Sequence, residues 1–316
     1  MDQTNSNNQN HNAKFAFFYL LSLVALGFLA VAVGNVLFQI INKNVADISD
    51  YTGYNPEALR FAIAAIIVAA PIYFLSVKQI NKNLFAGILD KDAGVRKWLT
   101  YLVLLISSVT IIGDLINVIF NYLGGELTLK AFLKGLTILI IAGAIFSYYL
   151  YDIKRDKLQG EKDGVIKMFG YGSLAAVVIV FIASFFFVES PAVARSMRLD
   201  AEVVDKMSQI ENAAQMYYNT EGKLPESLPA LIDGNNFIQA DTLQNHVAKK
   251  EFEYSIIEDK KYELCTEFLR SNLNDDYGPY GYIDTRWLHD AGRDCVTRTV
   301  GDYNNNMEKP LPVERF

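Results

Sequence analysis

The sequence contains few of the side chains on which most metal and redox chemistry depends. Its 316 residues include three histidines and two cysteines. The histidines (His11, His246 and His289) are far apart, whereas zinc sites need three or four ligands. The sequence also has no Gly-rich phosphate-binding motif with its Lys and no serine nucleophile motif. We therefore expect no catalytic residues, no metal, no cofactor and no enzymatic activity.

Charged residues are nearly absent from five long stretches of the chain. These apolar runs cover about residues 15–41, 59–77, 98–120, 131–151 and 165–188. A helix rises about 1.5 Å per residue and the hydrocarbon core of a bilayer is about 30 Å thick, so roughly 20 residues cross it. Such runs cross as helices because unpaired backbone groups are costly in lipid. The sequence predicts five transmembrane helices that contact the lipid bilayer.

The short loops predict the orientation of these helices. The loops after the second and fourth runs hold ten basic residues: Lys78, Lys82, Lys91, Arg96, Lys97, Lys154, Arg155, Lys157, Lys162 and Lys167. The alternate loops hold four: Lys43, Arg60, Lys130 and Lys134. Loops rich in Lys and Arg stay in the cytoplasm. We therefore expect a multi-pass protein of the inner or plasma membrane, with a cytoplasmic N-terminus and an extracytoplasmic C-terminal domain.

Four parts of the chain differ in composition. Residues 1–14 are rich in Asn and Gln and are predicted to be a disordered polar tail. Residues 15–164 are predicted to form a four-helix transmembrane domain, residues 165–188 a fifth transmembrane helix, and residues 189–316 a small extracytoplasmic α+β domain. This last part carries 14 basic and 23 acidic residues, a net charge of −9. Such a charge repels nucleic acid, so we expect no nucleic-acid partner.

One acidic residue interrupts the third apolar run. Thr110, Asp114, Asn117 and Asn121 recur at spacings that place them on one helix face. In an antiparallel hairpin with the fourth run, Lys134 lies within reach of Asp114. An intramembrane acid suggests a path for protons or ions. The alternative is an Asp–Lys or Asp–Asn contact that fixes helix packing, and both interpretations remain open.

The membrane half as a whole, residues 15–188, resembles small uncharacterised bacterial integral-membrane domains that have four helices and a following anchor helix. The resemblance is based on the hydropathy pattern and on the third span that carries Asp114. It implies an arrangement of helices and no known activity.

The C-terminal part begins with a predicted amphipathic helix. After Pro191, apolar side chains recur every three or four residues, as expected of one buried helix face: Leu199, Val203, Met207, Ile210, Ala214 and Tyr217. Gly222 is expected to end this helix, because glycine adopts the left-handed conformation without penalty. A hairpin follows, with alternating apolar residues at 252–256, a turn at 259–260 and a second strand from Tyr262.

This pattern carries a family resemblance. The helix ends in Gln215-Met216-Tyr217-Tyr218-Asn219, followed by Glu221-Gly222-Lys223-Leu224-Pro225 and then by Leu228 and Leu231. Over about residues 193–300, this motif resembles the globular heads of type IV pilins and secretion pseudopilins. The resemblance implies a long helix packed on an antiparallel sheet, stapled by a disulfide, in a component of a pilus or secretion system. The four spans before the fifth helix are a difference from that family, so the resemblance implies the fold more directly than a filament.

Both cysteines lie in the part predicted to be outside the cytoplasm. Thiols in an oxidising compartment pair, and the alternative of a metal site has only His289 nearby as a further ligand. The sequence therefore predicts a disulfide between Cys265 and Cys295. It closes a loop of about 30 residues, which the chain-entropy model values at about 3.5 kcal/mol.

The loop between the cysteines is rich in aromatic and acidic residues. Tyr277, Tyr280, Tyr282 and Trp287 are interleaved with glycine and proline. They are candidates for a partner-binding surface, since Tyr and Trp dominate binding hot spots; alternatively, they cover a small core. Residues 272–276 offer oxygen ligands for calcium, although a solvated turn explains them equally and no Glu stands at EF-hand spacing.

Two functions from different classes follow from these observations. The first is a structural or interaction protein of the cell envelope, which displays a pilin-like domain and binds an envelope protein or a second copy of itself. The alternative is a transporter or channel subunit in which Asp114 and Lys134 act and the outer domain regulates them. A receptor is a third hypothesis, but the basic loops are too short to hold a signalling domain.

Overall fold

The computed structural model describes residues 3–45, 53–86, 94–154, 163–232, 238–275, 277–279, 281 and 283–301, with backbone alone for residues 3–14. The chain divides into two compact units, Met1–Val188 and Glu189–Phe316. The predicted fold class is confirmed, because five long apolar helices precede a small antiparallel sheet region that contains one disulfide.

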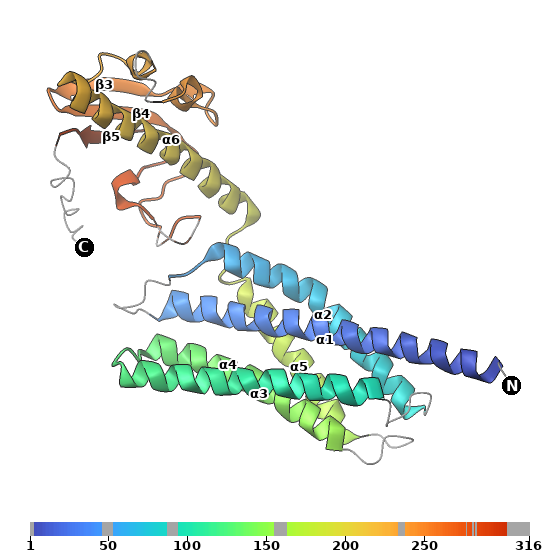
Figure 1. Ribbon diagram of the computed structural model, residues 1–316. Coiled ribbons are helices and arrows are strands. Elements are labelled where there is room, and N and C mark those ends of the chain that lie inside the picture. Colours follow the sequence, from blue (N-terminus) through green and yellow to red (C-terminus); the bar gives the residue numbers. More distant parts are fainter. Residues whose placement is uncertain are drawn as a thin grey trace. The chain divides into compact units, whose positions relative to one another are not determined.

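The first unit consists of helices. They are α1 (Gln3–Asn44), α2 (Pro56–Phe85), α3 (Gly94–Leu123), α4 (Leu129–Lys154) and α5 (Gly164–Ser184), labelled in Figure 1. All five are long and apolar enough to cross a membrane. The helices extend beyond the apolar runs where the sequence supplies a cap: the Asn55 side chain accepts from the backbone N–H groups of Glu57 and Ala58, and Asp163 caps α5 in the same way.

Helix α1 begins earlier than the sequence predicts. The backbone of residues 3–14 is helical, where a disordered tail is expected. Once a helix has formed, each added residue gains a backbone hydrogen bond without a new nucleation cost. No proline or glycine interrupts residues 3–14, so the helix of the first span continues into the polar residues despite their composition.

The helices of this unit pack as two hairpins. Helix α1 packs along α2, α3 packs along α4, and α1 also contacts α4 and α3 (Figure 1). Helix α5 is the least buried of the five spans. The Tyr54 hydroxyl, just before α2, donates to the carbonyl of Phe187 after α5, at 2.6 Å. Most outward-facing side chains are apolar, as expected of helices that contact lipid.

The second unit is built on one long helix, α6 (Pro191–Glu221). Ser190 caps its start and Gly222, with φ of 72°, ends it in the predicted left-handed conformation. The predicted apolar face is confirmed, since Val203, Met207 and Ile210 are fully buried. They form a core with Tyr262, Leu264, Phe268 and Trp287, among others.

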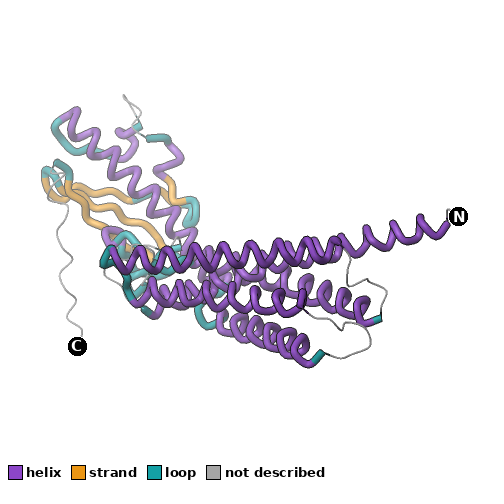
Figure 2. Tube along the Cα trace, turned by 60° about the horizontal axis from the view of Figure 1, so that its bottom comes forward, coloured by secondary structure: helices purple, strands orange, loops and turns teal. Residues whose placement is uncertain are grey.

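The strands of this unit form an antiparallel sheet of order β3-β4-β5 (Figure 2). Its strands are β3 (Glu253–Glu258), β4 (Lys261–Phe268) and β5 (Gly292–Thr299). A two-stranded pair joins β1 (Gln244–Asn245) to β2 (Lys250–Glu251), and short 3-10 helices cover Leu228–Leu231, Ala240–Leu243 and Thr285–Trp287. Alternate residues of β4, from Tyr262 to Phe268, face the core, so the sheet packs one face against α6.

Candidate functional site

Asp114 is a buried carboxylate in the last third of α3, toward the turn that leads to α4. Its residue is 7% exposed, and its Oδ2 atom is buried without a hydrogen-bond partner among the described residues. Gly135 of α4 makes room for it: a Cβ built on Gly135 would lie 3.6 Å from Oδ1 and 3.7 Å from Oδ2. An unsatisfied buried polar group costs about 1–3 kcal/mol, more when it is charged. Such a position in a spanning helix is a candidate functional site.

The Asp114 carboxylate lies against Gly135 of α4. The predicted contact between Asp114 and Lys134 stays a prediction. Asn117, predicted to share the face of Asp114, is exposed. A spacing of three residues leaves it about 60° from Asp114, which is enough to place it outside the contact with α4.

A second buried polar cluster lies near the other end of the same hairpin. Arg96 Nη2 of α3 donates to Oδ2 and to the backbone carbonyl of Asp152 of α4, both at 2.8 Å. Both side chains are nearly inaccessible. Nearby, the hydroxyl groups of Tyr73 of α2 and Tyr149 of α4 lie close to each other and to Asp152. The Arg96–Asp152 pair is not predicted from the sequence, because Arg96 counts there as a loop charge. The sequence does hold a signal for it: a basic and an acidic residue lie at roughly equal distances from the turn of the predicted hairpin.

Small hydroxyl side chains lie between these two clusters. Thr100 and Ser107 of α3 and Thr137 of α4 are buried. Ser107 and Thr137 donate to carbonyls of their own helices, those of Val103 and Leu133. At 1.5 Å per residue, Arg96 and Asp114 are about 27 Å apart along α3, close to the thickness of the hydrocarbon core. The α3–α4 contact is therefore polar at both ends and hydroxyl-bearing between them.

The second unit carries an open groove along α6. Its volume is about 1020 Å³, close to the upper limit of the usual range for ligand sites. It is lined by α6 residues between Met197 and Met216 and by residues between Ile238 and His246. The rest of its lining comes from the segment before β5: Arg270, Asn272, Asp275, Gly278, Pro279, Ile283, Asp284, Trp287 and His289. Acidic side chains line it, with Asp205, Asp241 and Asp284 among them. The groove is large enough for a segment of a polypeptide partner.

Two of the four predicted aromatic residues of the Cys265–Cys295 loop, Tyr277 and Trp287, are buried. Tyr277 is 8% exposed and donates a hydrogen bond of 2.5 Å to Oε1 of Glu189, just before α6. Trp287 is 3% exposed and also borders the groove. Tyr280 and Tyr282 lie outside the described residues. Burial favours a core-covering role for Tyr277 and Trp287, and partner binding by the four residues stays a prediction.

An ion pair connects α6 to the last strand beside Trp287. Arg298 of β5 lies 3.2 Å from Oε1 of Glu211, and its guanidinium stacks 4.0 Å from the centre of the Trp287 ring. Burial raises the pKa of the Glu211 carboxyl, and the nearby Arg298 charge opposes this effect. Burial likewise lowers the pKa of Arg298. The pair is well enclosed, and removing either partner would leave an uncompensated charge.

Asp200 and His289 occupy a polar position at the edge of the core. Asp200 accepts hydrogen bonds from the backbone N–H groups of Leu269, at 2.8 Å, and Arg270, at 3.0 Å. His289 stacks on the ring of Phe268 with centroids 3.6 Å apart. Burial raises the pKa of Asp200, against its two backbone hydrogen bonds, and burial lowers the pKa of His289. These contacts support the structural role predicted for His289.

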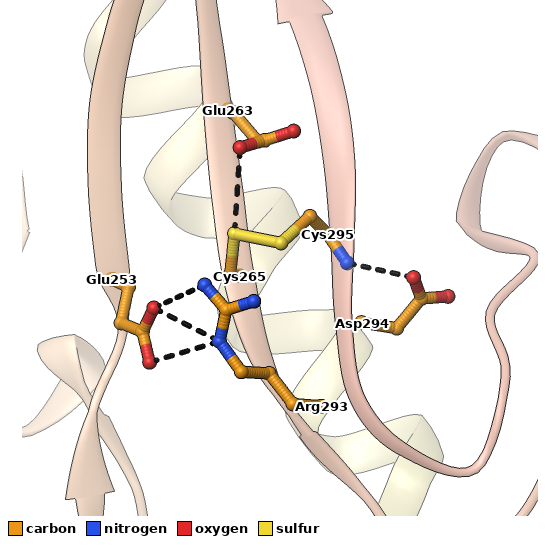
Figure 3. The surroundings of a disulfide bond; sticks show 6 residues. All are labelled: Glu253, Glu263, Cys265, Arg293, Asp294 and Cys295. Atoms are coloured by element: carbon orange, nitrogen blue, oxygen red, sulfur yellow. Dashed lines mark hydrogen bonds and ion pairs between the residues drawn. A yellow bond between two sulfur atoms is a disulfide. The ribbon is translucent and has the colours of Figure 1, made fainter.

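The predicted disulfide between Cys265 and Cys295 is confirmed (Figure 3). The two cysteines are directly opposite each other on β4 and β5. Figure 3 shows the Arg293 side chain beside Cys265, paired with Glu253 of β3 at 2.6 Å. Oε2 of Glu263 lies 3.7 Å from the Cys265 sulfur. Glu263 and the two cysteines form a compact group, but disulfide sulfurs are not thiolate ligands, so this group holds no metal.

Two of the side chains predicted as calcium ligands, Asn272 and Asp275, have partners within the protein. The Asn272 side chain accepts from the N–H of His289 at 2.7 Å and donates to the carbonyl of Trp287. Both carboxylate oxygens of Asp275 are bound by Arg270. Asp276 lies outside the described residues. The described part of this segment is therefore organised by its own hydrogen bonds.

Comparison with known proteins identifies one region. Residues 16–149 match the family model of a domain of unknown function, DUF5671. The matched segment holds most of α1 to α4, with Arg96, Asp114 and Gly135, and it ends shortly before Asp152. No curated protein and no solved structure gives a significant match. The first unit is thus similar over most of its length to a domain of unknown function, and the second unit lies outside the match.

Proposed function

We propose that this chain is a multi-pass envelope protein that displays residues 189–316 outside the cytoplasm and binds another protein through that domain. The observation that carries this proposal is the groove of about 1020 Å³ along α6. Open grooves between a rigid helix and loop walls are common binding sites for polypeptide segments. The proposal assigns no enzymatic activity and no cofactor to the chain.

Two independent features support the outer placement of this domain. Ten Lys and Arg residues in two loops against four in the alternate loops favour a cytoplasmic N-terminus. The Cys265–Cys295 disulfide persists in oxidising compartments. A membrane-impermeant thiol reagent on intact cells tests the placement. Both cysteines should react only after a reductant is added, and reaction only after permeabilisation would overturn it.

The arrangement of α6 on an antiparallel sheet also supports the proposed likeness to pilins and pseudopilins. In this proposal, the partner is a pilus or secretion component, or a second copy of the chain. The acidic groove favours a partner segment that carries basic residues, since rim charges steer association.

The test is site-specific photo-cross-linking in intact cells. Met216 lines the groove and is 44% exposed, so a photoreactive residue there should cross-link to one discrete protein. Ile257 of β3 is about as exposed and does not border the groove, so it provides the matched control. A bulky Ser208→Trp substitution in the groove should abolish the cross-link. Equal cross-linking from both positions, or none from Met216, would contradict the proposal.

A second candidate function is transport, favoured by the unpartnered Oδ2 of Asp114. A buried acid that makes no structural hydrogen bond is available to take up and release a proton. Proteoliposomes loaded with a pH-sensitive dye test this function directly. Proton entry that requires Asp114 and is lost in Asp114→Asn would support it. Equal dye traces from the native chain, the variant and empty vesicles would exclude it.

A further inference from the structure

A second groove lies within the membrane unit, among three helices. It has a volume of about 520 Å³ and is lined by residues 23–38 of α1, 103–110 of α3 and 138–145 of α4. It runs between the α1–α2 hairpin and the α3–α4 hairpin, whose contact with each other is less extensive than the contact within either hairpin. Asp114 and Lys134 do not line it. The groove shares Ser107 with the α3–α4 contact and does not include the Asp114 site.

The dimensions of this groove limit what can occupy it. The α1 segment that lines it rises about 22 Å from residue 23 to residue 38. A volume of about 520 Å³ spread over that length gives a cross-section of about 23 Å². A helix with its side chains is about 10–12 Å across and needs about 80 Å² or more. The groove is thus too narrow to enclose a whole helix of a partner or of a second copy, and its width suits one extended chain.

The chemistry of the lining calls for an apolar occupant. Its hydroxyl groups are already used, because Ser107 donates to the carbonyl of Val103 and Thr110 to that of Ile106. Asn35 is the one amide side chain in the lining, and it makes no hydrogen bond to any described residue. It lies toward one end of the α1 segment. A ligand with a long apolar chain and a hydrogen-bonding group near one end matches this distribution.

We propose that this groove binds a single acyl chain of a membrane phospholipid, with the ester region of the lipid near Asn35. The binding is a property of the membrane unit and does not depend on the function proposed for the outer domain. The lipid fills the space between the two hairpins, which no side chain of the described residues occupies. Bound in this way, it adds contacts between α1 and the α3–α4 hairpin.

Two glycines provide a matched test. Gly27 lines the groove, and a Cβ built on it meets nothing within 4 Å, so Gly27→Leu adds four carbons at the groove, of which the first has open space. Gly143 of α4 is equally open but does not line the groove, so Gly143→Leu is the control. The full chain is reconstituted in nanodiscs that contain a phospholipid with a diazirine on one acyl chain. Labelled residues are mapped by mass spectrometry after irradiation.

The native chain and Gly143→Leu should be labelled at residues 103–110 more strongly than at Ile179, an exposed α5 position that reports ordinary surrounding lipid. Gly27→Leu should lower labelling at 103–110 by about tenfold, equivalent to about 1.4 kcal/mol of binding free energy, and leave Ile179 unchanged. Unchanged labelling at 103–110 in Gly27→Leu would overturn the proposal, as would labelling no stronger than at Ile179. A native dimer that Gly27→Leu converts to monomers would also overturn it, because a second copy would then be the occupant. Circular dichroism confirms that each variant is folded.

Discussion

Two aspartates, one in each unit, are buried to a similar degree but differ in the hydrogen bonds that their carboxylates accept. Asp114 is 7% exposed and Asp200 is 3% exposed. Asp200 accepts one backbone N–H on each carboxylate oxygen, whereas Oδ2 of Asp114 has no partner among the described residues. Native proteins satisfy nearly all buried polar groups, and the exceptions concentrate where function requires them. The aspartate of the second unit is held by backbone hydrogen bonds, whereas the one in the first unit has an oxygen without a partner among the described residues.

Buried charge by itself does not separate the two units. Each contains an enclosed ion pair, Arg96–Asp152 in the first and Glu211–Arg298 in the second. Both pairs join elements far apart in sequence, and loss of one partner from such a pair costs about 3–5 kcal/mol. The two units differ at their aspartates, because Oδ2 of Asp114 has no hydrogen-bond partner among the described residues. Substitutions in the two units are therefore expected to change stability by different amounts.

The disulfide should give the largest difference, since only the second unit contains one. Replacing Cys265 and Cys295 together by Ser should lower the free energy of unfolding of that unit by about 3.5 kcal/mol, because the unfolded chain regains the entropy of a loop of about 30 residues. Urea unfolding followed by Trp287 fluorescence measures this change in a Trp98→Phe background, where Trp287 is the remaining tryptophan. The α-helical signal of the membrane unit in detergent should stay unchanged. A loss shared by both units would show that they unfold together.

Asp200→Ala should have the next largest effect. It leaves the buried N–H groups of Leu269 and Arg270 without their acceptor, at a cost of about 2–3 kcal/mol. The same Trp287 fluorescence assay measures it. Glu202→Ala, on an exposed position of the same helix, is the control and should change stability by less than about 0.5 kcal/mol. Equal effects at the two positions would mean that the Asp200 hydrogen bonds contribute little.

Gly135→Ala should weaken the α3–α4 contact by about 1–2 kcal/mol, as expected for overpacking. The added Cβ would lie 2.9 Å from Cγ2 of Val118, too close for an undisturbed contact. Gly143→Ala adds the same methyl group where nothing lies within 4 Å, and it should be neutral or stabilising. Unfolding of the membrane unit by SDS, followed by circular dichroism, compares the two variants. Equal stability of both would contradict the close approach at Gly135.

The sequence predicts the fold better than it predicts the site. Hydropathy locates five spans because each must satisfy its own backbone in lipid, and helical periodicity places Val203, Met207 and Ile210 in the core. The sequence does not predict the contacts of two charged residues between helices. Asp114 lies against Gly135, and Arg96 pairs with Asp152 although it counts as a loop charge. Helix rotation and hairpin register are fixed by tertiary packing, which periodicity within one segment does not specify.

A smaller effect is expected from His289, through pH. Burial lowers its pKa below the usual 6.5, and this effect outweighs the Asp290 carbonyl, Asp200 and Asp294, which raise it; the Arg270 charge lowers it further. Because the folded-state pKa lies below the unfolded value, the neutral histidine stabilises the fold above pH 6.5, and this stability is lost as pH falls through the lowered pKa. The free energy of unfolding should therefore decrease from pH 7.5 to pH 5.5. His289→Gln should flatten this decrease, and an unchanged slope would assign it to other groups.

Asp114→Asn should have the smallest effect on stability, and it tests the comparison most directly. The substitution keeps the shape of the side chain and removes the charge. Since Oδ2 has no described partner to lose, the SDS unfolding free energy should change by less than about 0.5 kcal/mol. The matched change Asp200→Asn turns an amide N–H toward a backbone N–H and should cost about 1–2 kcal/mol in its own unit. If Asp114→Asn instead lowers the unfolding free energy by about 3 kcal/mol or more, the substitution has broken a buried charged pair. Asp114 would then stabilise its unit through a contact, as Asp200 does.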